Sequence, residues 1–497
     1  FYNGGGVAVG DVNNDGLADI YFSGNLVASK LYINRGNWEF EDATESAGVA
    51  AAGLWNTGVA MADVNGDGWL DIYVCRSAAA SANRRKNLLF INTTATSGEV
   101  SFSEQGEAYG LDDVGYSPQA TFFEYDRDGD LDVFVLNHST QEFASFSNLV
   151  SQHKKRTNRQ LGDKLFKNEG GKFVDVSKEA GIIQNVLGFG LGVAVTDVNS
   201  DGWFDIYVTN DYNEEDYLYI NQQDGIFQES LRNYIGHTSL FSMGCDAADI
   251  NNDASPDIIT LDMLPEDNYR LKMSLGSENY DKYRELIRSG FHYQTMRNML
   301  QLNTSPPLEF NESGYPIRDI NNSSGFREIG QLAGISSTDW SWAPLMADFD
   351  LDGWKDVFVS NGYARNYLDM DFMNYVVNEQ VKAQQENLDV EMMGLVENMP
   401  AIKVSNYLYH NQRDLTFANR TEDWGLERPS LSNAAAYADL DNDGDLDLVV
   451  NNVNEEAFIY RNNQKQRNYL KIQLRGSEKN TFGIGAKVYL QNKGQTQ

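Results

Sequence analysis

The stretch DVNNDGLAD, Asp11–Asp19, places three carboxylates and two amides within nine residues. Like charges this close repel each other unless a positive charge lies among them. The pattern recurs six more times, with acidic or amide side chains at positions one, three, five and nine, and six of the seven copies have glycine at position six. The other copies are DVNGDGWLD from Asp63, EYDRDGDLD from Glu124, DVNSDGWFD from Asp197, DINNDASPD from Asp249, DFDLDGWKD from Asp348 and DLDNDGDLD from Asp439.

This spacing predicts a calcium loop. A hard cation takes six to eight oxygens from carboxylates, amides and backbone carbonyls. Glycine at position six allows a sharp turn, so that the carbonyl of position seven faces the ion. Asx-turns at hairpins favour the same residues, but seven copies in register favour calcium, with up to seven ions, one per repeat. The predicted ligands are Asp11, Asn13, Asp15, Leu17 and Asp19; Asp63, Asn65, Asp67, Trp69 and Asp71; Glu124, Asp126, Asp128, Asp130 and Asp132; Asp197, Asn199, Asp201, Trp203 and Asp205; Asp249, Asn251, Asp253 and Asp257; Asp348, Asp350, Asp352, Trp354 and Asp356; and Asp439, Asp441, Asp443, Asp445 and Asp447.

Two copies depart from the pattern. Ala254 replaces glycine at position six, and a left-handed turn there costs an alanine about 1 kcal/mol. Glu124 replaces aspartate at position one. We therefore expect the Asp249 loop to bind calcium most weakly and the Glu124 loop next.

The composition limits the class of protein. The chain has 497 residues and a net charge of −33, which argues against nucleic-acid binding. The two cysteines, Cys75 and Cys245, do not form a disulfide framework. No apolar stretch is long enough to span a membrane. The chain starts directly on a strand, which suggests a segment of a longer protein.

Every acidic loop leads into a short apolar, β-rich segment such as DIYF or DVFV. A second half follows, as in LYINRGNWEF from Leu31, which predicts two more strands joined by a turn. One repeat is therefore four antiparallel strands, and seven repeats predict an all-β, seven-bladed β-propeller. A row of β-sandwiches is the alternative, but the shortest interval, from Asp11 to Asp63, is too short for a sandwich.

These motifs resemble the FG-GAP/VCBS repeat of integrin α-subunit propellers and bacterial surface proteins. The run RNYLKIQLRGSEKNTFGIGAKVYL, Arg467–Leu490, resembles the start of the UnbV/ASPIC domain, which follows such repeats in the cartilage acidic protein family. The resemblance implies a propeller over residues 1–466, with residues 467–497 as the start of a truncated UnbV/ASPIC-like domain or as closing strands. It also implies a secreted or surface-bound, calcium-loaded module, lipid-anchored in an outer membrane if bacterial.

Extra length falls after the second strand in repeats three, five and six, at residues 138–163, 262–297 and 363–403, and the last two have helical character. In a four-stranded meander, these insertions share a face with the inter-blade links, opposite the acidic loops. Aromatic side chains in the links suit a sugar or peptide ligand, although packing under the insertions is the favoured explanation. They are Trp55, Tyr116, Phe189, Phe241, Trp340 and Trp342.

The sequence therefore predicts a non-catalytic, calcium-binding module that presents its decorated face to a protein, a glycan or a surface assembly. A calcium-dependent, lyase-like enzyme acting on polysaccharides is the alternative. The five histidines show no metal-ligand spacing. Asn92, Asn303 and Asn419 stand in sequons for glycosylation.

Overall fold

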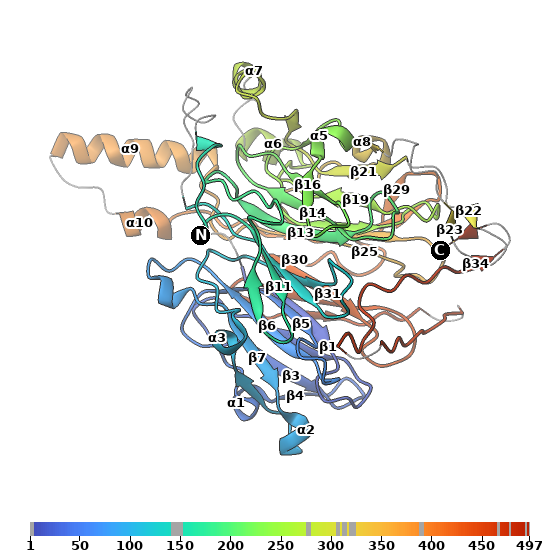
Figure 1. Ribbon diagram of the computed structural model, residues 1–497. Helices are drawn as coiled ribbons and strands as arrows, with labels where there is room; N and C mark the ends of the chain where they lie inside the picture. The colour runs from blue at the N-terminus through green and yellow to red at the C-terminus, as the bar shows by residue number, and fades with distance from the viewer. Residues whose placement is uncertain are drawn as a thin grey trace.

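The computed structural model describes residues 4–140, 153–274, 280–304, 309–310, 316–317, 325–386, 392–464, 468–476, 479–492 and 495–496. Strands dominate, and they form seven consecutive antiparallel sheets (Figure 1). The expected seven-bladed β-propeller with four-stranded blades is confirmed, with one difference. The seventh sheet has three strands in the part of the chain that is described.

Each blade is a meander whose first strand lies nearest the axis. The strands are β1 (Val7–Gly10), β2 (Asp19–Phe22), β3 (Lys30–Asn34) and β4 (Phe40–Asp42); β5 (Asn56–Ala62), β6 (Asp71–Arg76), β7 (Leu88–Asn92) and β8 (Phe102–Glu104); β9 (Ala120–Phe123), β10 (Asp132–Val135), β11 (Lys164–Asn168) and β12 (Phe173–Asp175); β13 (Gly190–Thr196), β14 (Asp205–Asn210), β15 (Tyr217–Asn221) and β16 (Phe227–Glu229); β18 (Cys245–Ala248), β19 (Asp257–Thr260), β21 (Met299–Asn303) and β24 (Phe326–Glu328); β25 (Ser341–Ala347), β26 (Asp356–Asn361), β28 (Tyr407–Asn411) and β29 (Phe417–Asn419); and β31 (Ser432–Ala438), β32 (Asp447–Asn452) and β33 (Phe458–Tyr460).

The seven inner strands form a closed ring. Each contacts the inner strand of the next blade, and β31 contacts β1. Close approach at the axis requires residues without a side chain, because a Cβ on Gly58 would lie 2.5 Å from the Pro118 carbonyl oxygen and one on Gly244 would lie 2.0 Å from that of Trp342. Gly6 N–H donates to Thr57 O at 2.9 Å and so links the first two inner strands directly.

The hydrophobic core lies between the blades, because each second strand is covered on both faces. All six residues of β6, β14 and β26 are buried, as expected for strands that are apolar at consecutive positions. Ile20, Leu440 and Val449 pack together where the seventh blade meets the first. This contact closes the ring.

Helices are short and lie outside the blades. One-turn helices follow or flank outer strands: α1 (Thr44–Ala47), α2 (Thr94–Ser97), α3 (Gly106–Tyr109), α5 (Leu231–Tyr234), α8 (Gly330–Ala333) and the 3-10 turn Ala82–Arg84. Longer helices form the predicted insertions of blades 5 and 6: α6 (Asn268–Ser274), α7 (Tyr280–Arg288), α9 (Met370–Glu386) and α10 (Met392–Glu397). In Figure 1, α9 and α10 project on the side where the inner strands begin. Much of residues 138–163, expected as an insertion, lies outside the described residues.

The described residues also form four two-stranded pairs. They are β17 (Thr238–Ser239) with β20 (Gln294–Thr295), β22 (Glu309–Phe310) with β23 (Pro316–Ile317), β27 (Val404–Ser405) with β30 (Pro429–Ser430), and β34 (Gln491–Asn492) with β35 (Gln495–Thr496). The hairpin β22–β23 lies between the third and fourth strands of blade 5. Part of the extra length of that repeat therefore lies on the acidic-loop face, which the sequence did not predict.

Residues 468–476 and 479–490, which we call the crossing segment, lie over the acidic loops. Tyr469 lies against Gly444, Lys479 Nζ is 2.6 Å from Asp130, and Lys487 pairs with Asp197. The segment adds no strand to the seventh sheet among the described residues. That it begins a further domain stays a prediction. None of the described helices has the length and apolarity that a membrane span requires.

Candidate metal centres

The seven acidic motifs, numbered loop 1 to loop 7 in chain order, are the turns between the first and second strands. In loop 1 the carboxylate of Asp11 accepts the N–H groups of Asp15 at 3.1 Å and Gly16 at 2.7 Å. Asn13 Oδ1 accepts from Asp15 N–H at 3.1 Å, and Asp15 accepts from Leu17 N–H at 2.9 Å. These bonds hold the side chains of positions one, three and five on the inside of the turn.

Two positions in each loop adopt left-handed backbone. The sequence predicted one of them, position six, where φ is +88° at Gly16 and +67° at Ala254. The other is position four, which is occupied by Asn14, Gly66, Arg127, Ser200, Asn252, Leu351 and Asn442. Asparagine, which is enriched in this region, stands there in three of the seven copies. Asparagine at position four was the sequence signal for this left-handed residue, but the other four copies have different residues there.

The aspartate at position nine is buried in every loop. In loop 1 Asp19 is fully buried, and its two oxygens accept N–H groups from Val12 at 2.9 Å and from Asn34 in β3 at 2.8 Å. Burial is the largest cause of a raised pKa in all seven. The pKa is about 7 for Asp19 and Asp71, about 8 for Asp132, Asp257 and Asp356, about 6 for Asp447, and well above its usual value for Asp205.

The loop residues fit a hard, oxygen-preferring cation. Three sets of acidic side chains bring one oxygen each within 4.8 Å of the others: Glu124, Asp126 and Asp132; Asp348, Asp350 and Asp356; and Asp439, Asp441 and Asp443. In loops 3 and 7 several buried carboxylate oxygens have no hydrogen-bond partner in the described structure. They are the Oδ1 atoms of Asp126, Asp130, Asp439, Asp441 and Asp445. A buried carboxylate oxygen is costly without a partner, and a bound cation would supply one.

The two atypical loops keep the shared geometry. Ala254 holds a positive φ, and its N–H donates to Asp249 at 2.7 Å as glycine does elsewhere. The longer side chain of Glu124 still accepts from Asp128 N–H at 3.1 Å and Gly129 N–H at 2.7 Å. Burial raises the pKa of Glu124 to about 7. The expected ranking of their affinities stays a prediction.

An asparagine at or just after the end of the third strand joins neighbouring loops in six of the seven blades, and it was not among the predicted site residues. Asn92 Nδ2 donates to Leu70 O in its own loop at 3.1 Å and to Val12 O in loop 1 at 2.8 Å. The equivalent bonds to the neighbouring blade come from Asn34, Asn221, Asn303, Asn411 and Asn462. Asn92 and Asn303 are buried, so they do not act as the glycan acceptors that their sequons suggest.

The crossing segment supplies polar groups to four loops. Lys471 Nζ lies 3.4 Å from Asp439 and 2.6 Å from the Asn442 side-chain oxygen. Lys479 and Lys487 pair with Asp130 and Asp197, and Thr481 donates to Asp63. These contacts offset part of the negative charge of the loop face.

The opposite face opens on a channel along the axis. Its volume is about 330 Å³, and residues at or near the starts of all seven inner strands line it, among them Gly5, Thr57, Gln119, Leu191 and Asp246. Of the six predicted ligand-binding aromatics, Trp342 lines this channel. Each of the six lies at or just before an inner strand, as expected.

Packing accounts for several of these aromatics. Trp340 stacks on Tyr363 with ring centroids 3.8 Å apart, and Trp342 Nε1 donates to Gly362 O at 2.7 Å. Phe189 lies 4.7 Å from the His138 ring. Phe189, Trp340 and Trp342 are buried, whereas Trp55, Tyr116 and Phe241 are half-buried. A role of these six in ligand binding stays a prediction.

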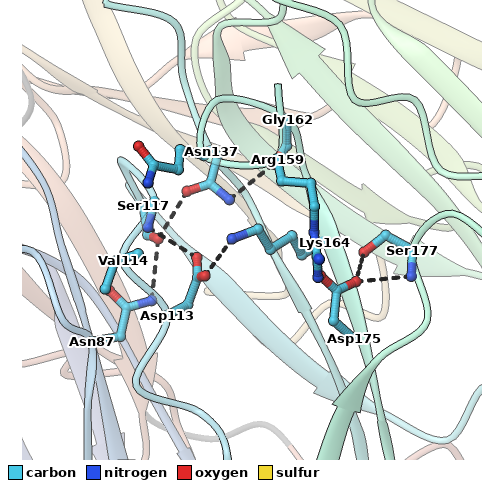
Figure 2. A network of polar contacts seen from close by, with 12 residues as sticks. Asn87, Asp113, Val114, Ser117, Asn137, Arg159, Gly162, Lys164, Asp175 and Ser177 are labelled. Atoms are coloured by element: carbon cyan, nitrogen blue, oxygen red, sulfur yellow. Dashed lines mark hydrogen bonds and ion pairs between the residues drawn. The ribbon is translucent and has the colours of Figure 1, made fainter. Parts of the chain in front are cut away.

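Contacts specific to one blade hold this face together, as Figure 2 shows for the link between blades 2 and 3. Lys164 at the start of β11 pairs with Asp113 in the link, and both side chains are nearly inaccessible. Ser117 receives a hydrogen bond from Asn87 at 3.1 Å and donates to Asn137 at 3.0 Å. Asn137 in turn donates to Gly162 O at 3.0 Å, which fixes the end of the blade 3 insertion.

The histidines occupy unrelated environments. His138 is buried, its ring nitrogens lie 2.7 Å from Ser77 Oγ and 2.8 Å from Ser139 O, and burial lowers its pKa to about 4. His237 lies 3.5 Å from Glu328, and His410 lies 3.3 Å from Asp350 in loop 6. His410 was not among the predicted site residues.

Comparison with known proteins agrees with this geometry. A family model described as an FG-GAP-like repeat matches residues 11–74, 197–260 and 401–450. Human cartilage acidic protein 1 is 28% identical over 211 residues, which is 42% of this chain and 28% of the human protein. The Xenopus tropicalis protein of the same name is also 28% identical, over 42% of this chain and 29% of its own length. The match thus spans less than a third of these relatives.

Two solved structures show a distant likeness. An Agrocybe aegerita lectin, described as recognising non-reducing terminal N-acetylglucosamine, is 15% identical, with a TM-score of 0.45 over 93% of this chain and 92% of that one. BBS1N in complex with ARL6DN is 8% identical, with a TM-score of 0.28 over 72% of this chain and 88% of that one. Neither likeness carries an argument about ligands, since both TM-scores lie below 0.5.

Proposed function

From a seven-bladed propeller that carries FG-GAP-like repeats and is related to cartilage acidic protein 1, we propose a non-catalytic module in which calcium rigidifies one face and a protein or glycan partner binds the other. The observation that carries the calcium half is the buried aspartate at position nine, which accepts the N–H group of position two in all seven loops. In loops 1 to 6 the carboxylate at position one also accepts the N–H group of position six. Seven buried carboxylates in oxygen-lined turns favour a bound cation of matching charge.

Each loop would contribute the side chains of positions one, three, five and nine and the carbonyl of position seven. Bound calcium would supply positive charge that balances these carboxylates. The chain's own residues preform the turn through the N–H groups of positions five, six and seven, so little rearrangement is needed on binding. Up to seven ions would fill the loops, in agreement with the number of blades.

The partner half of the proposal rests on the face opposite the loops. There the insertion helices α9 and α10 extend from the blades, and the axial channel opens among apolar and backbone groups. Exposed apolar side chains on α9 recur at helical spacing, at Met370, Met373, Val377 and Val381. An amphipathic helix of this kind suits a protein partner, and half-buried aromatics near the channel suit a sugar.

An extracellular or cell-surface location fits this proposal, since calcium loops of modest affinity fill at the calcium concentrations found outside cells. A role within a larger surface assembly is equally compatible with a chain that matches a part of longer relatives. The lyase-like alternative predicts new unsaturated ends when anionic polysaccharides are incubated with the protein, which a direct assay detects.

Two measurements test the proposal. Isothermal titration of chelator-treated protein with calcium should show binding to several sites, and magnesium should bind much more weakly, because it prefers octahedral coordination with several waters. No heat of calcium binding would contradict the metal half.

For the partner half, residues 367–399 would be replaced by a short Gly-Ser linker. The hydrogen bond from Asn366 N–H to Pro400 O, at 2.8 Å, closes this insertion at its base. The shortened protein should keep its melting temperature and its calcium sites but lose partner capture on a glycan array or from solubilised membranes of the source organism. Undiminished binding would show that this insertion does not form the partner site.

A further inference from the structure

The seven loops fall into two groups that differ at two positions at once. Loops 1, 2, 4 and 5 have asparagine at position three, and loops 3, 6 and 7 have aspartate: Asn13, Asn65, Asn199 and Asn251 against Asp126, Asp350 and Asp441. The residue before the asparagine that ends each third strand divides in the same way. It is Ile33, Ile91, Ile220 and Leu302 in the first group, and Lys167, His410 and Arg461 in the second.

Strand register brings these two positions to the same loop. In blade 3, Val133 pairs with Phe166, so the next residue, Lys167, lies opposite Asp132 at position nine. The same register holds in blade 1, where Ile20 pairs with Tyr32. The residue that precedes each third-strand asparagine therefore lies beside the loop of its own blade. The two groups of loops thus differ at structurally equivalent positions.

In the asparagine group, the amide at position three donates to the carboxylate at position five. The distances from Nδ2 to Oδ2 lie between 2.9 and 3.1 Å for the pairs Asn13–Asp15, Asn65–Asp67, Asn199–Asp201 and Asn251–Asp253. The neighbouring aliphatic side chain has no polar role, and Ile33 is fully buried. These loops carry three carboxylates at positions one, five and nine, and the described structure gives them no cation from the third strand.

In the aspartate group, position three adds a carboxylate that repels position five. The third-strand residue contacts both. Lys167 pairs with Asp126 and lies 3.4 Å from Asp128. His410 lies 3.3 Å from Asp350 and 3.7 Å from Asp352, and Arg461 lies 2.8 Å from Asp441 and 3.8 Å from Asp443.

We propose that Lys167 and Arg461 are counter-cations built into loops 3 and 7, where each offsets the extra carboxylate at position three. His410 holds the equivalent place in loop 6. The inference rests on the proposed calcium function and deepens it. One extra carboxylate and one cation compensate each other at positions one, three, five and nine. Asp126 Oδ1 and Asp441 Oδ1 remain buried without partners, so loops 3 and 7 keep a carboxylate oxygen for an ion while the cation stays in place.

The consequence is a division of labour among the sites. Loops 1, 2, 4 and 5 have no cation at the third-strand position that precedes the asparagine, whereas loops 3 and 7 hold part of their neutralisation there, in addition to the lysines that the crossing segment supplies to loops 3, 4 and 7. Removing the third-strand cation should therefore weaken the ion-free protein and strengthen ion binding at that loop. Removing the extra carboxylate alone should weaken ion binding.

A double-mutant cycle in loop 3 tests this coupling, with Lys167→Ile, Asp126→Asn and the double variant, which copies the asparagine group. In chelator, K167I should lower the melting temperature, and the double variant should recover most of that loss. By calorimetry, K167I should tighten the loop 3 calcium affinity about tenfold, and D126N should weaken it by a similar factor, because one unit charge near the ion changes. Lys167→Arg keeps the charge and is the control.

Loop 4 provides the reciprocal experiment if K167I does not fold. There Asn199→Asp alone should destabilise the protein in chelator, and adding Ile220→Lys should rescue it. Additive effects in both cycles would overturn the proposal. If neither the parent protein nor any of its variants binds calcium, the proposed function fails. The coupling measured in chelator still decides whether these residues compensate the extra carboxylate.

Discussion

The two faces of the propeller are built by opposite strategies. On the loop face, seven copies of one turn bury the same aspartate at position nine, and a ring of asparagines links neighbouring loops in the same way around most of the circle. On the opposite face, each link has its own contacts, such as the buried pair of Lys164 and Asp113. The repeated face holds the acidic loops, and the varied face holds the helical insertions. A family of such propellers could therefore change the varied face without altering its acidic loops.

The largest expected effect on stability comes from removing calcium from the loop face. Each ion that binds the folded chain alone stabilises it by about 2.7 kcal/mol when its concentration is 100 times the dissociation constant. With several sites filled, excess chelator should lower the melting temperature by on the order of 10 °C. The variant shortened at residues 367–399 should show the same fall. Superimposable melting curves with and without chelator would contradict a structural role for calcium.

The pH dependence should also separate ion-free from ion-loaded protein. The position-nine carboxylates have folded pKa values raised by burial, to about 7 for Asp19 and about 8 for Asp132, above an unfolded value of about 3.9. Such a group stabilises the folded state fully below its unfolded pKa and loses this contribution as pH rises through the folded pKa. In chelator, the melting temperature should therefore fall between about pH 5 and pH 8.

Calcium should reverse that dependence, because a bound ion favours the ionised carboxylates and competes with protons. The difference in melting temperature between calcium and chelator should grow from pH 5 to pH 8. Parallel profiles in the two conditions would show that the buried aspartates are not ion ligands. The same series with magnesium in place of calcium serves as the control.

An effect of intermediate size on stability is expected when one of the asparagines that link neighbouring loops is replaced. Asn92→Ala leaves the buried carbonyl of Val12 and the part-buried carbonyl of Leu70 without their Asn92 donor. The free energy of unfolding should fall by about 1–3 kcal/mol, measured by denaturant titration. Asn463→Ala removes an exposed side chain one residue after an equivalent asparagine, Asn462, and should change stability by less than about 0.5 kcal/mol. Equal effects of the two substitutions would mean that the links between loops do not stabilise the ring.

The contrast between the faces also explains how much the sequence could predict. The blades, the seven loops and the faces of the insertions follow from local patterns that repeat, so seven copies reinforced one interpretation. The left-handed residue at position four was missed because its occupants range from Gly66 to Leu351. The charge compensation between Asp126 and Lys167 joins residues 41 apart, and it became visible once strand register was known.

The opposite face resisted prediction for a physical reason. Its contacts join segments that no repeat relates, as in the pair of Lys164 and Asp113, which are 51 residues apart. Aromatic residues there are buried in some blades and partly exposed in others. Trp340 is buried against Tyr363, whereas Tyr116 is half-buried. Sequence spacing predicted that these side chains lie next to the inner strands, but it could not predict how deeply each one is buried.

The smallest expected effect concerns the turn at position six and tests whether the loops are preformed. Ala254 already has φ of +67° and accepts the shared turn geometry. Ala254→Gly should relieve a backbone strain of about 1 kcal/mol, and the greater freedom of glycine in the unfolded chain offsets about 0.4–1 kcal/mol of that gain. The net change in the free energy of unfolding should therefore be below about 0.5 kcal/mol, and equal in calcium and in chelator. Gly16→Ala provides the matched reverse change, because a Cβ at Gly16 meets no atom within 4 Å and its cost is confined to the backbone at φ of +88°. If Ala254→Gly stabilises the protein in calcium alone, the turn must change on ion binding, and the Asp249 loop would then be the weakest site for the reason predicted from its sequence.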